Sequence, residues 1–194
     1  MFEPAEQSRV KGFSVNHDPS DCKPAGRVRL LAAATLIGVL HLTGCATATF
    51  QHGVYTKNQT TYRVGLLGPD WQPVHVSDND LAFHRTHMGT ISANATCSDY
   101  EDVPTTALLN HLLFETTERR SLVEEVVTLD GRGARHVVMQ AELDGVPLEF
   151  EVFVLKKDGC VFDLTHIRSP QPPPAARASF LAFVQQFAVL RVQR

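Results

Sequence analysis

Three Asp-Gly dipeptides constrain the fold of this chain more than any other feature of its sequence. Asp130, Asp144 and Asp158 are each followed by glycine, and this dipeptide strongly favours the tight turn of a β-hairpin. Between the turns apolar and polar residues alternate, for example from Val137 to Leu143, as in strands with one buried face. The sequence therefore predicts an antiparallel meander of strands over residues 124–167.

Two helices are expected to flank this meander. The first starts after Pro104 and is predicted over residues 105–114, where leucines recur at helical spacing. The second follows the proline-rich residues 169–174, and its apolar residues recur at intervals of three and four as far as Leu190. The expected fold class is therefore α+β, an antiparallel sheet meander flanked by helices.

The N-terminal half contains three shorter segments that favour strands, at residues 61–66, 81–85 and 90–97. The stretch before them, residues 46–58, is rich in small and polar side chains and has no sustained period. We expect residues 45–60 to form a flexible tether outside the fold, and residues 61–194 to form a single α+β domain.

An export signal precedes this tether. Arg27 and Arg29 supply positive charge, residues 30–40 form an apolar run, and the small residues Thr43 and Gly44 stand at its end. This order is that of a secretory signal peptide, which is removed from the mature protein. The run is shorter than the roughly 20 apolar residues that a membrane-spanning helix needs. Residues 27–44 are therefore interpreted as a signal peptide.

Leu42 stands three places before Cys45, with Thr43 and Gly44 between them, and this pattern resembles the lipobox of bacterial lipoproteins. The resemblance implies that signal peptidase II cuts between Gly44 and Cys45. It also implies diacylglyceryl on the Cys45 thiol and a fatty acyl group on the new amino terminus, and two or more chains hold a protein firmly on a membrane. Ala46, where an aspartate would favour the inner membrane, implies an outer-membrane anchor that faces the periplasm. The alternative is that Cys45 only follows an ordinary secretory signal or lies in a buried helix.

Residues 1–26 form a polar leader that is much longer than the segment that usually precedes an apolar signal run. We expect translation to begin downstream, for example at Val28, or this leader to be disordered. We therefore exclude it, together with Cys22, from the fold.

The mature chain, residues 45–194, is 150 residues long, which fits one domain with a sizeable core. It contains 13 Lys and Arg and 17 Asp and Glu, a formal net charge of −4. Its cations are scattered singly or in pairs, whereas nucleic-acid binding needs concentrated positive charge. Gly131 and Gly133 lie in a hairpin turn and not in the strand-to-helix loop that cradles phosphates. We expect neither a nucleic-acid partner nor a cofactor.

Two cysteines remain in the mature domain, Cys97 and Cys160. An even pair in an oxidising compartment is typical of a disulfide, which would stabilise the domain by roughly 4 kcal/mol in the loop-entropy model. The alternatives are two buried free thiols, or a reactive cysteine served by a histidine.

A proline shortly before Trp71 follows the first predicted strand of the 61–194 domain, and a helix, the meander and an aromatic-rich helix come after it. This order of elements, over residues 62–190, resembles the PsbP-like superfamily of α/β/α sandwiches. The superfamily includes extrinsic photosystem subunits and many bacterial lipoproteins. The resemblance implies the fold, and it implies a role in binding or assembly. It transfers no functional residue to this chain.

Two sets of residues have side chains suited to a catalytic or metal site. His84 and His87 stand three apart, but in a strand and its following loop that spacing points them to opposite faces, so no metal site is expected. Cys160, Asp163 and His166 are the parts of a cysteine nucleophile site, yet one extended strand holds Cys160 and His166 too far apart to exchange a proton. His111 or His136 would have to approach through the fold. We expect no catalytic residue and no enzyme.

Trp71 and the phenylalanines of the final helix are expected in the core, although an aromatic helix on a sheet can leave a cleft for an apolar ligand. The predicted function is a membrane-anchored, non-catalytic binding or assembly module of the cell envelope, with an envelope protein as partner. One alternative is a carrier of a lipid or other apolar ligand that serves a transport system. The other is a small envelope hydrolase.

Overall fold

The computed structural model describes residues 13–15, 48–58, 60–77, 79–97 and 103–192. The predicted signal peptide, its cleavage position after Gly44 and the predicted lipidation at Cys45 lie outside these residues. Among the helices that are described, none is both long and apolar enough to cross a membrane.

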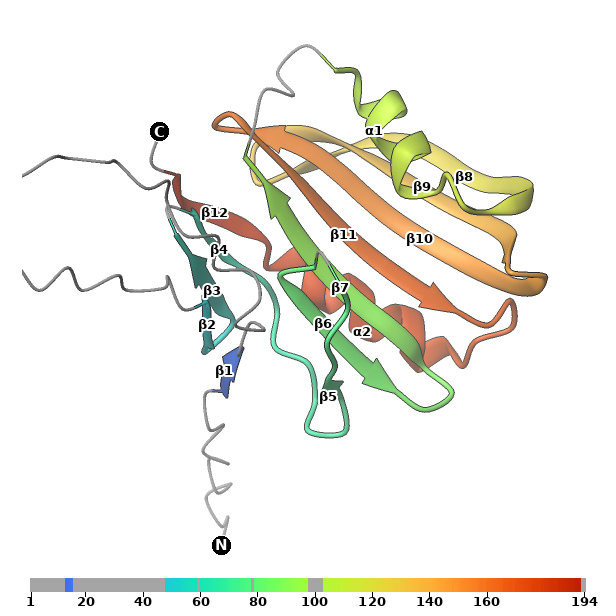
Figure 1. The fold of residues 1–194 in the computed structure, drawn as a ribbon, viewed down its shortest axis with the longest axis horizontal. Helices are drawn as coiled ribbons and strands as arrows, with labels where there is room; N and C mark the ends of the chain where they lie inside the picture. The colour runs from blue at the N-terminus through green and yellow to red at the C-terminus, as the bar shows by residue number, and fades with distance from the viewer. Residues whose placement is uncertain (1–12, 16–47, 59, 78, 98–102, 193–194) are drawn as a thin grey trace, which may run out of the picture.

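Two antiparallel sheets and two helices make up the described fold (Figure 1). The larger sheet has the strand order β5-β6-β7-β11-β10-β9-β8, with bounds Gln72–Pro73, Leu81–Arg85, Gly89–Thr96, Cys160–Arg168, Val146–Lys157, Arg132–Leu143 and Thr117–Leu129. The smaller sheet has the order β1-β2-β3-β4-β12, with bounds Phe13–Val15, Ala48–Gln51, Val54–Lys57, Thr60–Arg63 and Ala188–Val192. The helices are α1, Thr105–Leu112, and α2, Pro174–Gln185. The predicted class, antiparallel β with flanking helices, is confirmed.

The predicted meander forms the larger part of the larger sheet. Each strand from β9 to β11 pairs antiparallel with the strand before it in the chain. Asp130, Asp144 and Asp158 have positive φ angles of 49°, 52° and 53°, and the glycine after each is positive as well. Two successive positive φ values are what a type I′ hairpin turn requires. The Asp-Gly dipeptides therefore set the register of three hairpins.

The two faces of the larger sheet are covered differently. In Figure 1, α1 and α2 lie on opposite sides of this sheet. The α2 side forms one core with the smaller sheet, and it is rich in aromatic side chains, among them Tyr62, Phe162, Phe180 and Phe183. The α1 side is aliphatic, with Leu109 and Leu113 of the helix segment packed on valines of β9 and β10. We call these the α2 face and the α1 face.

The disulfide predicted between Cys97 and Cys160 is present, with a Cα–Cα distance of 4.1 Å. It joins the end of β7 to the start of β11, two neighbouring strands in which Thr96 lies opposite Val161. Both alternatives, buried free thiols and a reactive cysteine, are thereby excluded for these two residues.

The tether predicted at residues 45–60 is wrong where the structure describes it. Residues 48–57 form the hairpin β2–β3, and Ala48, Phe50 and Tyr55 are buried in the α2-face core. The two strands have only four residues each, which is too short to show a sustained alternation. The folded domain therefore begins at or before Ala48. The exclusion of residues 1–26 from the fold is also wrong for Phe13–Val15, which form β1 and pair antiparallel with β2.

The final helix is shorter than its periodicity predicts. It ends at Gln185, and Ala188–Val192 forms β12, which pairs with β4 through a bulge between Val189 and Arg191. Phe187 fits the helical spacing and is buried, but it lies between the two elements. A helix and a following strand can thus place apolar residues at intervals that resemble one longer helix.

The predicted first strand of the meander, residues 124–129, is the second half of a longer strand, β8. Its first half is exposed on both faces, so it shows no alternation of apolar and polar residues by which it could have been found.

Candidate functional site

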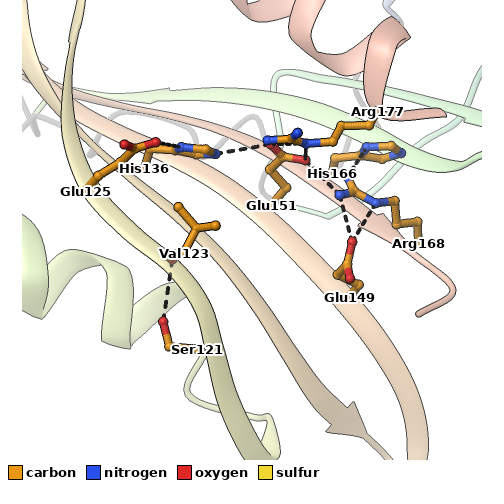
Figure 2. Close-up of polar contacts among 9 residues, drawn as sticks. All are labelled: Ser121, Val123, Glu125, His136, Glu149, Glu151, His166, Arg168 and Arg177. Atoms are coloured by element: carbon orange, nitrogen blue, oxygen red, sulfur yellow. Dashed lines mark hydrogen bonds and ion pairs between the residues drawn. The ribbon is translucent and has the colours of Figure 1, made fainter. Parts of the chain in front are cut away.

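A cluster of ionisable side chains lies on the α2 face, where β8 to β11 and α2 meet (Figure 2). Alternation along each strand directs these side chains toward α2, among the aromatic residues of the core. We call the following seven residues the charged cluster: Glu125, His136, Glu149, Glu151, His166, Arg168 and Arg177.

Glu151 is the centre of the charged cluster and is fully buried. Arg168 Nη2 donates to its Oε2 at 2.7 Å, and His136 Nε2 lies 3.1 Å from its Oε1. Arg177 of α2 donates through Nε to both oxygens, at 3.1 and 3.2 Å. Burial alone would raise the pKa of Glu151, but the hydrogen bonds of His136 and Arg168 and the two guanidinium charges lower it to about 2. Glu151 is therefore a carboxylate at neutral pH.

Arg168 holds two carboxylates and a histidine. Its Nε and Nη2 donate to Glu149 Oε1 at 3.1 and 2.8 Å, in addition to the bond to Glu151. Its Nη1 donates to Nδ1 of His166 at 2.7 Å, which requires this nitrogen to be unprotonated. Nε2 of His166 then carries the proton and donates to the Met88 carbonyl at 2.8 Å. Burial lowers the pKa of His166 to about 4, and the neighbouring Arg168 charge acts in the same direction, so His166 is neutral.

His136 lies between two carboxylates. Its Nδ1 is 2.9 Å from Glu125 Oε1, its Nε2 is 3.1 Å from Glu151 Oε1, and its ring stacks on Phe153 at 4.1 Å. Burial would lower its pKa, but the hydrogen bonds to Glu151 and Glu125 and their charges raise it. With both ring nitrogens donating to carboxylates, the protonated form is the one that this geometry stabilises.

The charged cluster is thus a closed network whose members bind one another. A general base works best with a pKa near the ambient pH, and Glu151 is far below that range. Both ring nitrogens of His136 and of His166 are engaged. Arg177 connects α2 to β10 through Glu151, so the clearest physical role of the network is to fix the position of α2 on the sheet.

The residues considered for a cysteine nucleophile are not assembled into a site. Cys160 is oxidised in the disulfide, and a thiolate would be the nucleophile. Cys160 and His166 share the α2 face, as the sequence predicts, whereas Asp163 alternates to the α1 face. Burial, and then the charge of Asp80, raises the pKa of Asp163 to about 7. The three side chains therefore do not meet.

The histidine pair also remains apart from other ligands. His84 Nδ1 lies 3.1 Å from Thr90 Oγ1, and both His84 and His87 are exposed. Among the described residues there is no group of three His, Cys, Asp or Glu side chains that could hold a metal ion. Trp71, Phe180 and Phe183 are buried in the core, as predicted.

Most of the charged cluster could not be found from alternation alone. Alternation predicts Glu149 and Glu151 on the polar, outward side of their strand, but β10 is covered on both faces. A usable signal exists in the hairpin register, because Glu149 lies opposite Arg168 and Glu151 opposite His166 at equal distances from the Asp158-Gly159 turn. Acidic and basic residues opposite each other in two central strands indicate a buried network.

A second feature is an apolar patch at the end of α1. Leu112, Phe114 and Val146 are 45%, 67% and 54% exposed. The register brings them to one end of the sheet, since Thr117, just after α1, lies opposite Glu142, and Val146 lies opposite Leu143. The His111 ring stacks on Phe114 at 6.2 Å. We call Leu112, Phe114 and Val146 the α1 patch.

Comparisons with known proteins give similarities of fold only. No family model and no curated protein matches this sequence. Among solved structures, the chain is similar to cyanobacterial PsbP (CyanoP) from Synechocystis, with 12% identity over 79% of this chain and 99% of that chain and a TM-score of 0.49. It is similar to PA94 of Pseudomonas aeruginosa, a protein of unknown function and putative regulator, with 12% identity, 78% and 99% coverage and a TM-score of 0.46. It is also similar to LpqN of Mycobacterium tuberculosis, which is involved in cell envelope biogenesis, with 13% identity, 67% and 83% coverage and a TM-score of 0.47.

Proposed function

We propose that this protein is a lipid-anchored module of the cell envelope that binds another envelope protein and catalyses no reaction. The observation that carries the proposal is the α1 patch, three large apolar side chains exposed together at one end of the sheet.

The envelope location rests on two independent features. The Cys97–Cys160 disulfide is typical of proteins that fold in an oxidising compartment outside the cytoplasm. The lipobox pattern that ends at Cys45 supplies the anchor, and Ala46 favours the outer membrane. An anchor of two or more acyl chains would keep the domain at the membrane surface.

The non-catalytic role is supported by the state of the reactive side chains. Cys160 is used in the disulfide, and His136 and His166 have both ring nitrogens engaged within the protein. The charged cluster lies under α2 and holds that helix on the sheet. Its two exposed members, Glu125 and Arg177, are each bound to another residue of the cluster.

The α1 patch has the properties of a docking surface. Phe114 is an aromatic side chain that could anchor a partner, and aromatic residues carry much of the binding energy at protein interfaces. Leu112 and Val146 can exclude water around such an anchor. The helix itself is fixed, because Leu109 and Leu113 are buried and Arg119 donates to the Leu113 carbonyl at its C-terminal end. A partner would therefore meet a preorganised surface.

The test is site-specific cross-linking in cells. A photoreactive amino acid replaces Phe114 in the full chain, and a matched variant carries it at Val76, an exposed apolar residue outside the patch. We expect one protein adduct of defined mass from position 114 that is absent from position 76. Leu112→Glu, which places a charge inside the patch, should abolish that adduct.

Three results would contradict the proposal. Equal labelling from positions 114 and 76 would mean that the patch has no specific partner. An adduct that persists unchanged in the Leu112→Glu variant would place the partner elsewhere. An adduct with the mass of a lipid would favour the alternative function, a carrier of an apolar ligand.

A further inference from the structure

The two edges of the larger sheet differ in how well they are protected. One edge is β5, which has two residues, one of them Pro73, and short strands and prolines are common ways to block strand pairing. The other edge is β8, which has 13 residues and no proline. Within the described part of the chain, no strand pairs with the outer side of β8. Its outward main-chain groups therefore form a template for another strand.

The side chains of β8 are exposed to an unusual degree for so long a strand. Leu122 is 44% exposed and Val126 is 67% exposed. An exposed edge strand with apolar and β-branched residues is a liability unless something covers it. This exposure makes β8 a candidate for pairing with another strand.

The charges along β8 point to the identity of that partner. Glu118, Arg119 and Arg120 stand in its first half, and Glu124 and Glu125 stand in its second half, so the net charge changes from positive to negative along the strand. Two copies of such a strand, paired antiparallel about a two-fold axis, place the basic half of one opposite the acidic half of the other. Opposite charges directly across a strand pair are favourable, and like charges are unfavourable.

A β-bulge in β8 puts the residues that would pair by charge on the same face of the strand. Residues paired across a two-fold axis perpendicular to the sheet must lie on the same face, and residues five apart on a regular strand lie on opposite faces. The irregularity between Ser121 and Val123 adds one residue, so that Arg120, opposite Gln140, and Glu125, opposite His136, both lie on the α2 face. The bulge also puts Ser121 and Glu124 together on the α1 face, opposite Met139 and Val137.

We propose that two copies of this protein pair through β8 in antiparallel orientation, with Arg120 of each copy opposite Glu125 of the other. The two-fold axis then passes between Leu122 and Val123, so that the exposed Leu122 of each copy lies opposite Val123 of the other. Ser121 lies opposite Glu124 of the other copy, although within its own chain Ser121 donates to the Val123 carbonyl and Glu124 binds Arg135. The larger sheets of the two copies become one continuous sheet.

The side chains of Arg120 and Glu125 are open to these contacts. Arg120 forms no ion pair within the described residues, and its side chain is exposed. Glu125 is 54% exposed while it binds His136, so one of its faces remains open to a second cation. The proposal is independent of the α1 patch, since α1 contacts mainly β10.

The test uses two charge reversals in the full acylated chain, Arg120→Glu and Glu125→Arg. Native mass spectrometry from detergent reports the state of association. We expect the unmodified protein to be a dimer. Each variant alone should be monomeric, with a dissociation constant raised about tenfold or more, because two ion pairs become two like-charge contacts.

The decisive sample is a mixture of the two variants. When an Arg120→Glu chain pairs with a Glu125→Arg chain, positions 120 and 125 carry opposite charges at both ends of the contact. A heterodimer should therefore form where neither variant dimerises alone. Arg132→Glu, an exposed charge reversal at the far end of the same hairpin, is the matched control and should leave the dimer intact. Thermal unfolding of each variant is measured to check that the fold is retained.

A monomeric unmodified protein would overturn the proposal. A dimer that survives both single reversals would place the contact elsewhere, and a mixture that stays monomeric would exclude the antiparallel register.

Discussion

The α2 face and the α1 face of the larger sheet show two ways to cover the same strands. On the α2 face, Phe162, Phe180 and Phe183 are completely buried, and five members of the charged cluster are buried with them, all except Glu125 and Arg177. On the α1 face, a single eight-residue helix packs on aliphatic residues, and Leu112 and Phe114 at its end remain exposed. The buried part of this face can hold charges only when each is paired, because an unpaired buried charge is very costly. A partly covered face is where the protein can present apolar surface to a partner.

Removal of Arg168 should break the α2 face most severely. Arg168→Ala leaves the carboxylates of Glu149 and Glu151 without their shared cation, and loss of one partner in a buried ion pair costs about 3–5 kcal/mol. The free energy of unfolding, measured by denaturant titration, should fall by that amount. Arg132→Ala, an exposed arginine at a turn, should change it by less than about 0.5 kcal/mol. Similar small losses in both variants would mean that the charged cluster does not hold the α2 face together.

Acid should lower the stability of the protein in the pH range in which the Glu151 carboxylate becomes protonated. The pKa of Glu151 is lowered from 4.5 to about 2, so its stabilising contribution is present above pH 4.5 and is lost as the pH falls toward 2. At 1.36 kcal/mol per pKa unit, this shift corresponds to a contribution on the order of 3 kcal/mol. Unfolding free energies measured across this range should decline, and Glu151→Gln should remove most of the decline. An unchanged acid limb in that variant would assign the effect to other carboxylates.

At higher pH, the change in unfolding free energy is expected to come from His136. Its pKa is raised above 6.5 by the carboxylates of Glu151 and Glu125, so its contribution is fully present below pH 6.5. That contribution is lost as the pH rises through the higher pKa of the folded protein. The same titration should therefore show a second decline in stability as the pH rises beyond 6.5, and His136→Gln should flatten it.

Substitutions in the α1 patch should change the unfolding free energy least and the binding of a partner most. Phe114→Ser changes an exposed side chain, so we expect the unfolding free energy to shift by less than about 0.5 kcal/mol. The same substitution should prevent capture of the partner by a photoreactive group placed at the neighbouring Val146. A loss of several kcal/mol in stability would show instead that Phe114 belongs to the core.

Local chemistry allowed part of the fold to be predicted from sequence. The Asp-Gly turns determine positive φ at two successive residues, and this gives the three hairpins and their register. The disulfide could be predicted because only Cys97 and Cys160 remain in the mature domain. These features depend on a few neighbouring residues or on a simple count, and they do not depend on the rest of the fold.

The charged cluster and the smaller sheet depend on long-range packing, and they could not be predicted in the same way. Alternation identifies one buried face, so it predicts Glu149 and Glu151 on an exposed face, whereas α2 covers them. The hairpin β2–β3 is too short for a period, and its burial depends on packing against distant aromatic residues such as Phe83, which contacts Phe50. Leu190 continues a helical spacing, but pairing of β12 with β4 determines its backbone.

The most direct test of the whole account is the mass of the mature protein. The full chain is extracted from the membranes of its own host in mild detergent, and an intact mass spectrum is recorded. The account predicts the mass of residues 45–194 with the Cys97–Cys160 disulfide intact, plus the diacylglyceryl group and the acylated amino terminus of Cys45. A mass that includes residues 1–44, or one that carries no acyl groups, would contradict the lipid anchor on which the proposed envelope role depends.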